Sequence, residues 1–379
     1  MISYLFSGLI THACRAVMLV LECCMGLWNK NKAGVFMDNN EKKIYTIDDI
    51  AHELGVSKTT VSRAISGKGR IGQMTRERVL KFIEEHDYRP NVLARGLAQK
   101  KTYNLALLLP KDYAATEFPF FKDCMNGICE AASENDYDII ISMLGENDLS
   151  QLQRLISNRK VDGVIVSRAT GNSAEQHYLK ENHIPFVVIG PSPDSDDASV
   201  DNKNREASEE LTSILLMKGI RRLAIFGGRE DYNVTGSRYS GYVDAHKKAG
   251  IYLDESLSFM NMDDQLKVSC AVEKALQKQT DGILCMDDVI CTMVLNCLRE
   301  KRIKIPNEYK VASLYDSRNL EYNNPSVTSV RFDTVRLGRI ACMKLLKLLG
   351  EEVEEDTAPL SYQVILREST QSADIAVKK

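Results

Sequence analysis

A short basic stretch holds the residues that best suit a chemical task. The sequence VSKTTVSRAISG, residues 56–67, sets hydroxyls and two cations beside one apolar stripe. Helix propensity does not favour so many Ser and Thr residues, and a solvated helix face more often carries Glu–Lys pairs four residues apart. Hydroxyls and cations on a short helix suit contact with phosphates and base edges of DNA. The candidate side chains are Ser57, Lys58, Thr59, Thr60, Ser62 and Arg63.

Two short helices joined by a glycine turn would position this face. Thr46 is typical of a helix N-cap, because an acidic residue follows three positions later. Gly55 suits a corner that needs positive φ, and Ser57 suits the cap of a second helix. A third helix is expected to begin at Thr75 and to end before Pro90. The pattern predicts a helix-turn-helix, whose second helix enters the major groove of DNA.

The charge distribution favours a nucleic-acid partner for this part of the chain. The 379 residues are 44% hydrophobic and 27% charged, with a formal net charge of −3. Residues 42–101 carry 13 Lys and Arg against 7 Asp and Glu, a net charge of +6. Residues 1–41 have equal numbers of basic and acidic residues, so residues 102–379 carry a net charge of −9. A basic head on an acidic body is typical of a DNA-binding module joined to something else. The length predicts two or three domains.

The first 36 residues do not match a targeting signal. They are largely apolar, but His12, Arg15 and Glu22 interrupt them, so no run of about 20 apolar residues exists to span a bilayer. A signal peptide would carry its basic residues ahead of the apolar run, whereas Arg15 lies inside it. Because a polar segment and a clear domain start follow Met37, we expect translation to begin there naturally. A membrane anchor is the alternative.

Metal and enzyme chemistry are not indicated. The ten cysteines include no C-x-x-C pair, and Cys285, Cys291 and Cys297 have no histidine cluster to accompany them. Buried thiols in a reducing compartment account for them. The six histidines are scattered, and neither a G-x-S-x-G motif nor a phosphate-binding loop occurs. We therefore expect no metal, no cofactor and no enzymatic activity.

The segment that follows the third helix makes the motif specific. YRPNVLARGLAQKKT, residues 88–102, starts with Pro-Asn and ends with basic residues. Together with YTIDDIAHELGVSKTTVSRAISG, residues 45–67, it resembles the LacI/GalR family of bacterial repressors, nearly residue for residue.

This resemblance implies roles for individual residues. The base-reading positions would be Lys58 and Thr59. Contacts to phosphates or bases would come from Thr60, Ser62 and Arg63, beside the caps Thr46 and Ser57. A hinge that enters the minor groove would contain Asn91, Ala94 and Leu97.

The body of the chain alternates apolar runs with amphipathic segments. The expected strands are Leu105–Leu109, Ile139–Ser142, Gly163–Ser167, Phe186–Gly190, Leu223–Phe226, Gly282–Cys285 and Val311–Tyr315. Helices are expected between them, as around Phe121–Glu134 and Glu206–Lys218. This alternation predicts parallel sheets covered by helices on both faces. About 265 residues exceed one such sheet, so we expect two similar lobes with a ligand cleft beyond the carboxyl ends of the strands.

The predicted organisation therefore has five parts. They are an extension at 1–36, a small all-α helix-turn-helix domain at 44–89, a hinge at 90–102, an α/β domain at 103–370 and a tail at 371–379. The α/β domain would consist of two doubly wound parallel-sheet lobes, which the resemblance makes periplasmic-binding-protein-like. It would bind an effector and form the dimer.

The family resemblance continues in the body and suggests effector-binding residues. The similar segments are FPFF at 118–121, VDGVIVS at 161–167, SVDNKNREAS at 199–208, GSRYSGY at 236–242 and NNPSVTSVRFDTVRLGRIA at 323–341. Two departures put the ligand's identity in doubt but not the fold. Asp287-Asp288 stands where the family has Asn-Asp, and the segment 314–317 replaces its Gly-Phe/Tyr-Asp-Asp.

Six side chains are candidate effector contacts. Phe120 and Phe121 could stack on a sugar or base ring, although paired aromatics after a strand are often core residues. Arg238 stands at the family's ligand-binding arginine and could donate to hydroxyls or a carboxylate. Arg168 adds a second positive charge and would suit an anionic effector. The remaining two, Asp288 and Asp316, could accept hydrogen bonds from sugar hydroxyls or could be exposed loop carboxylates.

These observations predict a cytoplasmic, sequence-specific DNA-binding transcriptional regulator, a repressor by the family resemblance. It would act as a homodimer on a near-palindromic double-stranded DNA operator, because one helix-turn-helix reads too few base pairs. A small-molecule effector, a sugar or a sugar derivative, would bind between the lobes and alter DNA affinity. No membrane partner is expected. The alternative is an extracytoplasmic sugar-binding protein of a transporter, which the helix-turn-helix does not suit.

Overall fold

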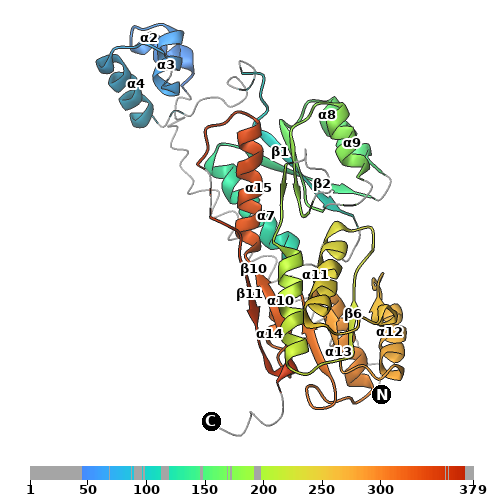
Figure 1. The fold of residues 1–379 in the computed structure, drawn as a ribbon. Coiled ribbons are helices and arrows are strands. Elements are labelled where there is room, and N and C mark those ends of the chain that lie inside the picture. The colour runs from blue at the N-terminus through green and yellow to red at the C-terminus, as the bar shows by residue number, and fades with distance from the viewer. Residues whose placement is uncertain are drawn as a thin grey trace, which may run out of the picture. The chain divides into compact units, whose positions relative to one another are not determined.

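The structure is a computed structural model of the chain (Figure 1). It describes residues 45–371 except for 68, 87, 89–95, 97–98, 112–118, 146–147, 169, 171–172, 192–197, 355 and 357. The chain divides near residue 94 into two compact units, a small helical one and a larger one with two lobes.

The first unit consists of three helices around a small core. The helices are α2 (Ile47–Glu53), α3 (Lys58–Ser66) and α4 (Gln73–Glu85). Gly55 adopts φ +64° at the corner between α2 and α3, which a glycine tolerates without strain. The buried core side chains are Ile50, Ala51, Val61, Ala64 and Val79. The predicted helix-turn-helix and third helix are confirmed, with the third helix starting two residues earlier than expected.

The first lobe of the larger unit is built on a five-stranded parallel sheet, ordered β2-β1-β3-β4-β5. Its strands are β1 (Asn104–Pro110), β2 (Asp138–Leu144), β3 (Gly163–Val166), β4 (Phe186–Ile189) and β5 (Ser199–Val200). Its helices are α7 (Pro119–Glu134), α8 (Ser150–Ser157), α9 (Ala174–Glu181) and α15 (Thr334–Leu348). Alternation along β1 sends Leu105 and Leu107 to the face covered by α7 and α15, and Ala106 and Leu108 to the face covered by α8 and α9.

The second lobe contains a six-stranded sheet, ordered β11-β10-β9-β8-β6-β7, in which only β11 is antiparallel. Its strands are β6 (Leu223–Phe226), β7 (Ser258–Phe259), β8 (Gly282–Cys285), β9 (Lys310–Ser313), β10 (Thr328–Phe332) and β11 (Tyr362–Ile365). Helices α12 (Gln265–Gln277) and α13 (Asp288–Glu300) cover one face, and α10 (Asn204–Met217) and α11 (Asn233–Ala249) cover the other. Three short helices complete the lobe: η1 (Glu255–Leu257), α14 (Arg318–Glu321) and η2 (Glu368–Thr370).

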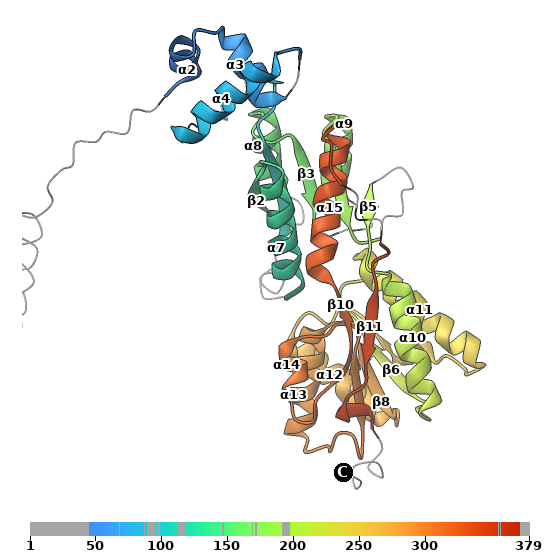
Figure 2. The ribbon, with the colours of Figure 1, turned by 90° about the vertical axis from the view of Figure 1, so that its left-hand side faces the viewer.

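The chain crosses between the lobes three times. The crossings lie between β5 and α10, between β10 and α15, and between α15 and β11. As a result α15 lies beside α7 in the first lobe, although it is encoded after most of the second lobe (Figure 1 and Figure 2).

The predicted fold class, two parallel-sheet α/β lobes after a helical head, is confirmed. All seven expected strands are present, as β1, β2, β3, β4, β6, β8 and β9. Four further strands were not predicted. Both β5 and β7 span only two residues, and β10 and β11 carry polar residues that break the apolar pattern.

Candidate functional site

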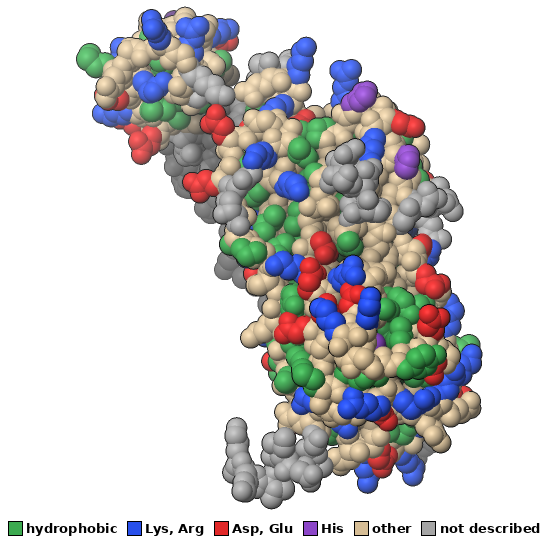
Figure 3. Space-filling model, in the orientation of Figure 1, with side chains coloured by type: hydrophobic (Ala, Val, Ile, Leu, Met, Phe, Trp, Pro, Cys, Tyr) green, Lys and Arg blue, Asp and Glu red, His purple; other side chains and the backbone are tan. Residues whose placement is uncertain are grey.

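Helix α3 presents a polar edge to solvent. Val61 and Ala64 are buried in the small core, while Lys58, Thr59 and Ser62 are exposed on the opposite side. Arg63 is exposed on the same side, and Lys58 forms an ion pair with Asp48 of α2. Figure 3 shows Lys and Arg side chains over the surface of this unit. The edge can therefore offer cations and hydroxyls to a polyanion.

Two of the predicted DNA-contacting hydroxyls, those of Thr46 and Ser57, cap helices. Thr46 Oγ1 accepts a hydrogen bond from the Asp49 N–H at 3.3 Å, and the Thr46 N–H donates to the Asp49 carboxylate at 2.7 Å, which completes a capping box. Ser57 Oγ accepts from the Thr60 N–H at 3.1 Å and lies 2.8 Å from Thr60 Oγ1. These hydroxyls thus fix the start of α2 and α3, which sets the direction of the polar edge.

The hinge residues predicted from the family resemblance lie outside the described part of the chain. They are Asn91, Ala94 and Leu97.

A cavity of about 190 Å³ lies between the two lobes of the larger unit. Its walls include residues that directly follow strands, such as Ser167 after β3, Asp201 after β5 and Met286 after β8. The carboxyl ends of parallel strands are where ligands bind in doubly wound folds, because loops and helix N-termini converge there. Five of the six predicted effector residues line this cavity: Phe120, Phe121, Arg168, Arg238 and Asp288.

Arg238 is held by groups from two elements of the cavity wall. Its Nε donates to Asn204 Oδ1 at 3.0 Å and its Nη1 donates to the Met286 carbonyl at 2.5 Å. Burial lowers the pKa of Arg238, and the charges of Asp287 and Asp201 oppose this shift. The guanidinium is therefore fixed in place beside a group of carboxylates.

Asp288 is a buried carboxylate with an unused acceptor. Asp288 is only 3% exposed, and no described residue donates a hydrogen bond to its Oδ1. Burial raises the pKa of Asp288 to about 6, the charge of Asp287 adds to this, and Ser317 opposes it. Asp287 itself caps α13 by accepting from the Ile290 N–H at 2.7 Å, and burial raises its pKa as well.

Asn202 is a cavity residue that the sequence analysis did not single out. It is 5% exposed, and its Oδ1 has no hydrogen-bond partner among the described residues. Asn202 lies two residues after the two-residue strand β5, which is too short to be visible as a pattern. Its position inside the segment SVDNKNREAS was the available signal.

Arg168 lies over two aromatic rings of the cavity wall. Its guanidinium carbon is 5.1 Å from the Phe121 ring centroid and 4.3 Å from that of Tyr232. Such cation–π contacts are favourable, and the contact with Tyr232 joins residues of the two lobes. Tyr232, from the loop that precedes α11, was not predicted as a site residue.

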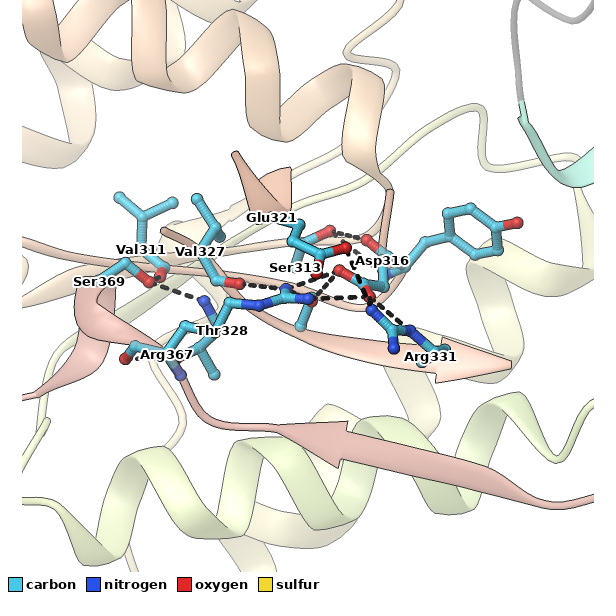
Figure 4. Close-up of polar contacts among 11 residues, drawn as sticks. Val311, Ser313, Asp316, Glu321, Val327, Thr328, Arg331, Arg367 and Ser369 are labelled. Carbon is cyan, nitrogen blue, oxygen red and sulfur yellow. Dashed lines mark hydrogen bonds and ion pairs between the residues drawn. The ribbon is translucent and has the colours of Figure 1, made fainter. Parts of the chain in front are cut away.

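The structure does not bring Asp316 to this cavity. Its carboxylate accepts from Arg367 Nη1 at 2.7 Å, Arg367 Nη2 at 3.1 Å, Ser329 Oγ at 2.5 Å and Arg331 Nε at 2.8 Å (Figure 4). Burial opposes ionisation, yet these hydrogen bonds hold the pKa of Asp316 below its ordinary value. Asp316 is thus a saturated ion-pair partner, and we leave it out of the proposed effector contacts. Arg367 is 51 residues away in sequence, so no local pattern indicated the pair.

Two features are absent from the part of the chain that the structure describes. No helix there combines the length and apolar character that crossing a bilayer requires. No group of three His, Cys, Asp or Glu side chains there is placed to hold a metal ion.

Comparison with known proteins gives matches over both units. Residues 46–91 match the family "Bacterial regulatory proteins, lacI family", and residues 212–370 match the "Periplasmic binding protein-like domain". The HTH-type transcriptional regulator RegA of Clostridium saccharobutylicum is 31% identical over 336 residues, which are 86% of this chain and 99% of RegA. The HTH-type transcriptional regulator MalR of Streptococcus pneumoniae is 30% identical over 81% of this chain and 93% of MalR.

Solved structures agree with these matches. A complex of the transcriptional regulator CelR with cellobiose has a TM-score of 0.64 and 26% identity, covering 86% of this chain and 99% of CelR. The lac repressor dimer bound to operator and an anti-inducer has a TM-score of 0.67, with the same coverage. At 18% identity this second likeness is one of fold.

Proposed function

Because the chain belongs to the LacI family of bacterial regulatory proteins and is a DNA-binding transcriptional regulator, we propose that it is a cytoplasmic repressor. It acts as a homodimer on a near-palindromic operator, since one helix-turn-helix spans too few base pairs for a unique site. The transporter alternative is set aside, because transcriptional regulators such as RegA match this chain over 99% of their own length.

The α3 edge supports specific roles in operator binding. Lys58 and Thr59, exposed at the start of α3, would read base edges, and Ser62 and Arg63 would contact phosphates or bases. The hydroxyls of Thr46, Ser57 and Thr60 would hold the N-terminal ends of α2 and α3 and would place these ends against the DNA backbone. Asn91, Ala94 and Leu97 would form the minor-groove hinge, in line with the family resemblance.

An operator-selection experiment tests these roles. Replacing Arg63 with Ala should weaken binding for all sequences and reduce the salt slope by about 1 if its partner is a phosphate. Replacing Lys58 with Ala should change the preferred operator. Lys81→Ala, an exposed cation on α4, is the matched control and should change neither property. Identical selected sites for the Lys58 variant and the parent would contradict the base-reading role.

A pair of unpartnered acceptors carries the effector proposal. Asn202 and Asp288 line one cavity, and the Oδ1 atom of each is buried and receives no hydrogen bond from any described residue. An unsatisfied buried acceptor costs about 1–3 kcal/mol, so a ligand that donates hydrogen bonds to both would recover this free energy. Hydroxyl groups are such donors. The oxygens of a carboxylate or a phosphate are themselves acceptors and would leave both Oδ1 atoms without a hydrogen bond.

The remaining wall of the cavity suits a sugar. Phe120, Tyr232 and Tyr315 supply flat apolar surfaces, and Arg238 supplies a fixed donor beside the carboxylates. The similar CelR structure is a complex with cellobiose, which supports a saccharide here. The effector would bind between the lobes and shift the population of lobe arrangements that the DNA-binding unit senses.

Calorimetric titration with sugars tests the effector site. Asp288→Asn should weaken binding of an accepted sugar at least about tenfold, because a charged acceptor is replaced by a neutral one. Asn202→Ala should weaken it by a smaller factor. Glu300→Gln, an exposed change at the far end of the same helix, serves as control. Unchanged sugar affinity in both cavity variants would contradict the site, and operator binding of the same proteins shows that they are folded.

A further inference from the structure

The second lobe has a basic edge where its parallel strands begin. Helices α10, α11, α12 and α13 each end there, because the helix of a parallel unit returns the chain to the start of the next strand. Counted from the last helical turn to the residue before the strand, the four connections are 214–222, 246–257, 274–281 and 297–309. They carry 11 Lys and Arg against 5 Asp and Glu, a net charge of +6. We call these four connections the basic edge.

The equivalent edge of the first lobe is neutral. Its three helix-to-strand connections, 131–137, 154–162 and 178–185, carry 4 Lys and Arg against 4 Asp and Glu. The helix macrodipole favours cations at helix C-termini in both lobes alike, so it does not account for a surplus in one lobe only. Residues 102–379 carry −9, so outside the basic edge they carry −15. The positive charge is therefore confined to one place on an acidic body.

Hydrogen bonds between the connections hold the basic edge together. The Asp281 carboxylate accepts from the Arg221 N–H at 2.7 Å, and the Asp281 carbonyl accepts from the Lys310 N–H at 3.2 Å, where β9 begins. Lys278 Nζ donates to Ser256 Oγ at 2.5 Å. The strand order β9-β8-β6-β7 also places the four connections side by side. The basic edge is thus one continuous surface of the second lobe.

Several cations of the basic edge are exposed and have no acidic partner. Lys248 forms an ion pair with Glu209, and Lys301 forms one with Glu273. Figure 3 shows Lys and Arg side chains over the lower end of the second lobe. Uncompensated cations gathered on one surface attract a polyanion. The exposed cations that form no ion pair with a described acidic residue are Lys218, Arg221, Lys247, Lys274, Arg302 and Lys304.

The composition of the basic edge favours DNA over a protein partner. Seven of its 11 cations are lysines, and lysine is depleted at protein–protein interfaces. Among the described residues of the edge, the large apolar side chains that are exposed are Met217 and Tyr252. Two such side chains do not make the apolar core that a stable protein interface contains. Protein–DNA interfaces are more polar and far more positively charged, as this surface is.

The shape of the basic edge favours a row of phosphates over one small anion. Small anions bind where backbone N–H groups converge at helix N-termini, whereas four helices end here with their carbonyl groups. Four strands about 4.8 Å apart give the edge a width of about 15 Å, with a helix about 10 Å across on each face. Lys and Arg side chains on such a surface can reach phosphates on both sides of a major groove about 12 Å wide.

We infer that the basic edge is a second DNA-binding surface, which holds a duplex segment other than the operator that the helical unit binds. It contacts phosphates and not base edges, so it binds DNA without sequence preference. One chain can therefore join two segments of DNA. This role goes beyond the proposed function, which concerns the helical unit and the cavity between the lobes.

A capture experiment with the full chain tests the second surface. The chain is bound to an operator duplex on beads, and a fluorescent duplex of unrelated sequence is added. The parent should capture the second duplex, and two unrelated sequences should be captured equally. The triple variant Lys218→Gln, Arg221→Gln and Lys247→Gln should lower the affinity for the second duplex at least about tenfold. Its salt slope should fall by up to about 3, because each phosphate contact contributes about 0.9.

A second triple variant is the matched control. Lys122→Gln, Arg154→Gln and Lys160→Gln remove the same charge from exposed side chains of the first lobe. This variant should capture the second duplex as the parent does. Both triple variants should bind the operator as the parent does, because their substitutions lie outside the helical unit, and this binding shows that they are folded.

Three outcomes would overturn the inference. The parent captures no second duplex at low salt, the basic-edge variant captures it as well as the parent, or the control variant loses capture equally. Vesicles of equimolar phosphatidylserine and phosphatidylcholine separate DNA from a membrane. If the parent binds these vesicles through the basic edge and captures no second duplex, the polyanion is a lipid surface and the DNA assignment is wrong. Operator binding by the helical unit is measured separately in each case, so the regulator function stands.

Discussion

Asp288 and Asp316 lie after neighbouring strands of one sheet, β8 and β9, and both carboxylates are buried. Asp288 keeps an oxygen without a partner among the described residues, and burial raises its pKa to about 6. Asp316 accepts four hydrogen bonds from Arg367, Ser329 and Arg331, and its pKa is held low. The two carboxylates thus occupy equivalent places in the fold, yet the pKa of Asp288 is raised and that of Asp316 is lowered.

The difference separates the carboxylate that we propose to bind the effector from a structural one. Burial is common to both, so burial does not decide the role. The supply of donors decides it, because a saturated ion pair stabilises the folded chain whereas an unsatisfied acceptor costs free energy until a ligand donates to it. The Asp316 cluster joins β9, β10 and the segment after β11 (Figure 4), while Asp288 lines the cavity between the lobes.

The largest effect is expected where the saturated cluster loses its central cation. Arg367→Met leaves Asp316 buried without its main partner and should lower the free energy of unfolding by about 3–5 kcal/mol. Urea denaturation at neutral pH measures this. Arg331→Ala removes a side chain that is 49% exposed and should cost at most about 1 kcal/mol. If Arg367→Met and Arg331→Ala lower the free energy of unfolding equally, the burial of Arg367 does not add to the strength of its ion pair with Asp316.

A pH series compares the two aspartates directly. The folded-state pKa of Asp288, about 6, exceeds the ordinary value of 3.8, so the native chain loses stability as pH rises from about 4 to 6. Asp288→Asn should therefore raise the free energy of unfolding at pH 7 by about 2–3 kcal/mol, and this gain should vanish below about pH 4.

Asp316→Asn should act with the opposite sign. Its folded-state pKa is depressed, so its contribution is present above the ordinary pKa and is lost as pH falls through the folded value. The variant should be less stable than the parent at pH 7. Denaturation midpoints of Asp288→Asn and Asp316→Asn at pH 4 and pH 7 measure these effects. If both variants shift the midpoint in the same direction at pH 7, the two carboxylates do not differ in their effect on stability.

The smallest effect concerns one hydroxyl beside each carboxylate. Ser329 Oγ accepts from Arg367 at 2.7 Å and donates to Asp316 at 2.5 Å, so Ser329→Ala should cost about 1.5 kcal/mol. Ser317 Oγ is buried near enough to Asp288 to lower its pKa, but it forms no hydrogen bond of good geometry with any described residue. Ser317→Ala should therefore change stability by less than about 0.5 kcal/mol. Thermal or urea unfolding of the pair is the measurement, and a larger loss from Ser317→Ala would contradict the comparison.

Much of the candidate site followed from local patterns, and the rest did not. Asp288 was found because it follows an apolar run that ends at a sheet edge, and Arg238 and Phe121 because their segments, GSRYSGY and FPFF, resemble the family. Asn202 was missed because a two-residue strand leaves no period to detect. Tyr232 was missed because its role depends on Arg168, which reaches it from the other lobe.

The sequence by itself determined the helical head and the winding of the body. Capping by Thr46 and Ser57, the positive φ of Gly55 and the alternation of apolar strands with helices are interactions between residues a few positions apart, so their signals are contiguous. Only the tertiary structure decided which carboxylate would be free to bind. The donors of a buried acceptor come from segments that the fold brings together, and Arg367 reaches Asp316 across 51 residues while nothing reaches Asp288 Oδ1 from the described chain.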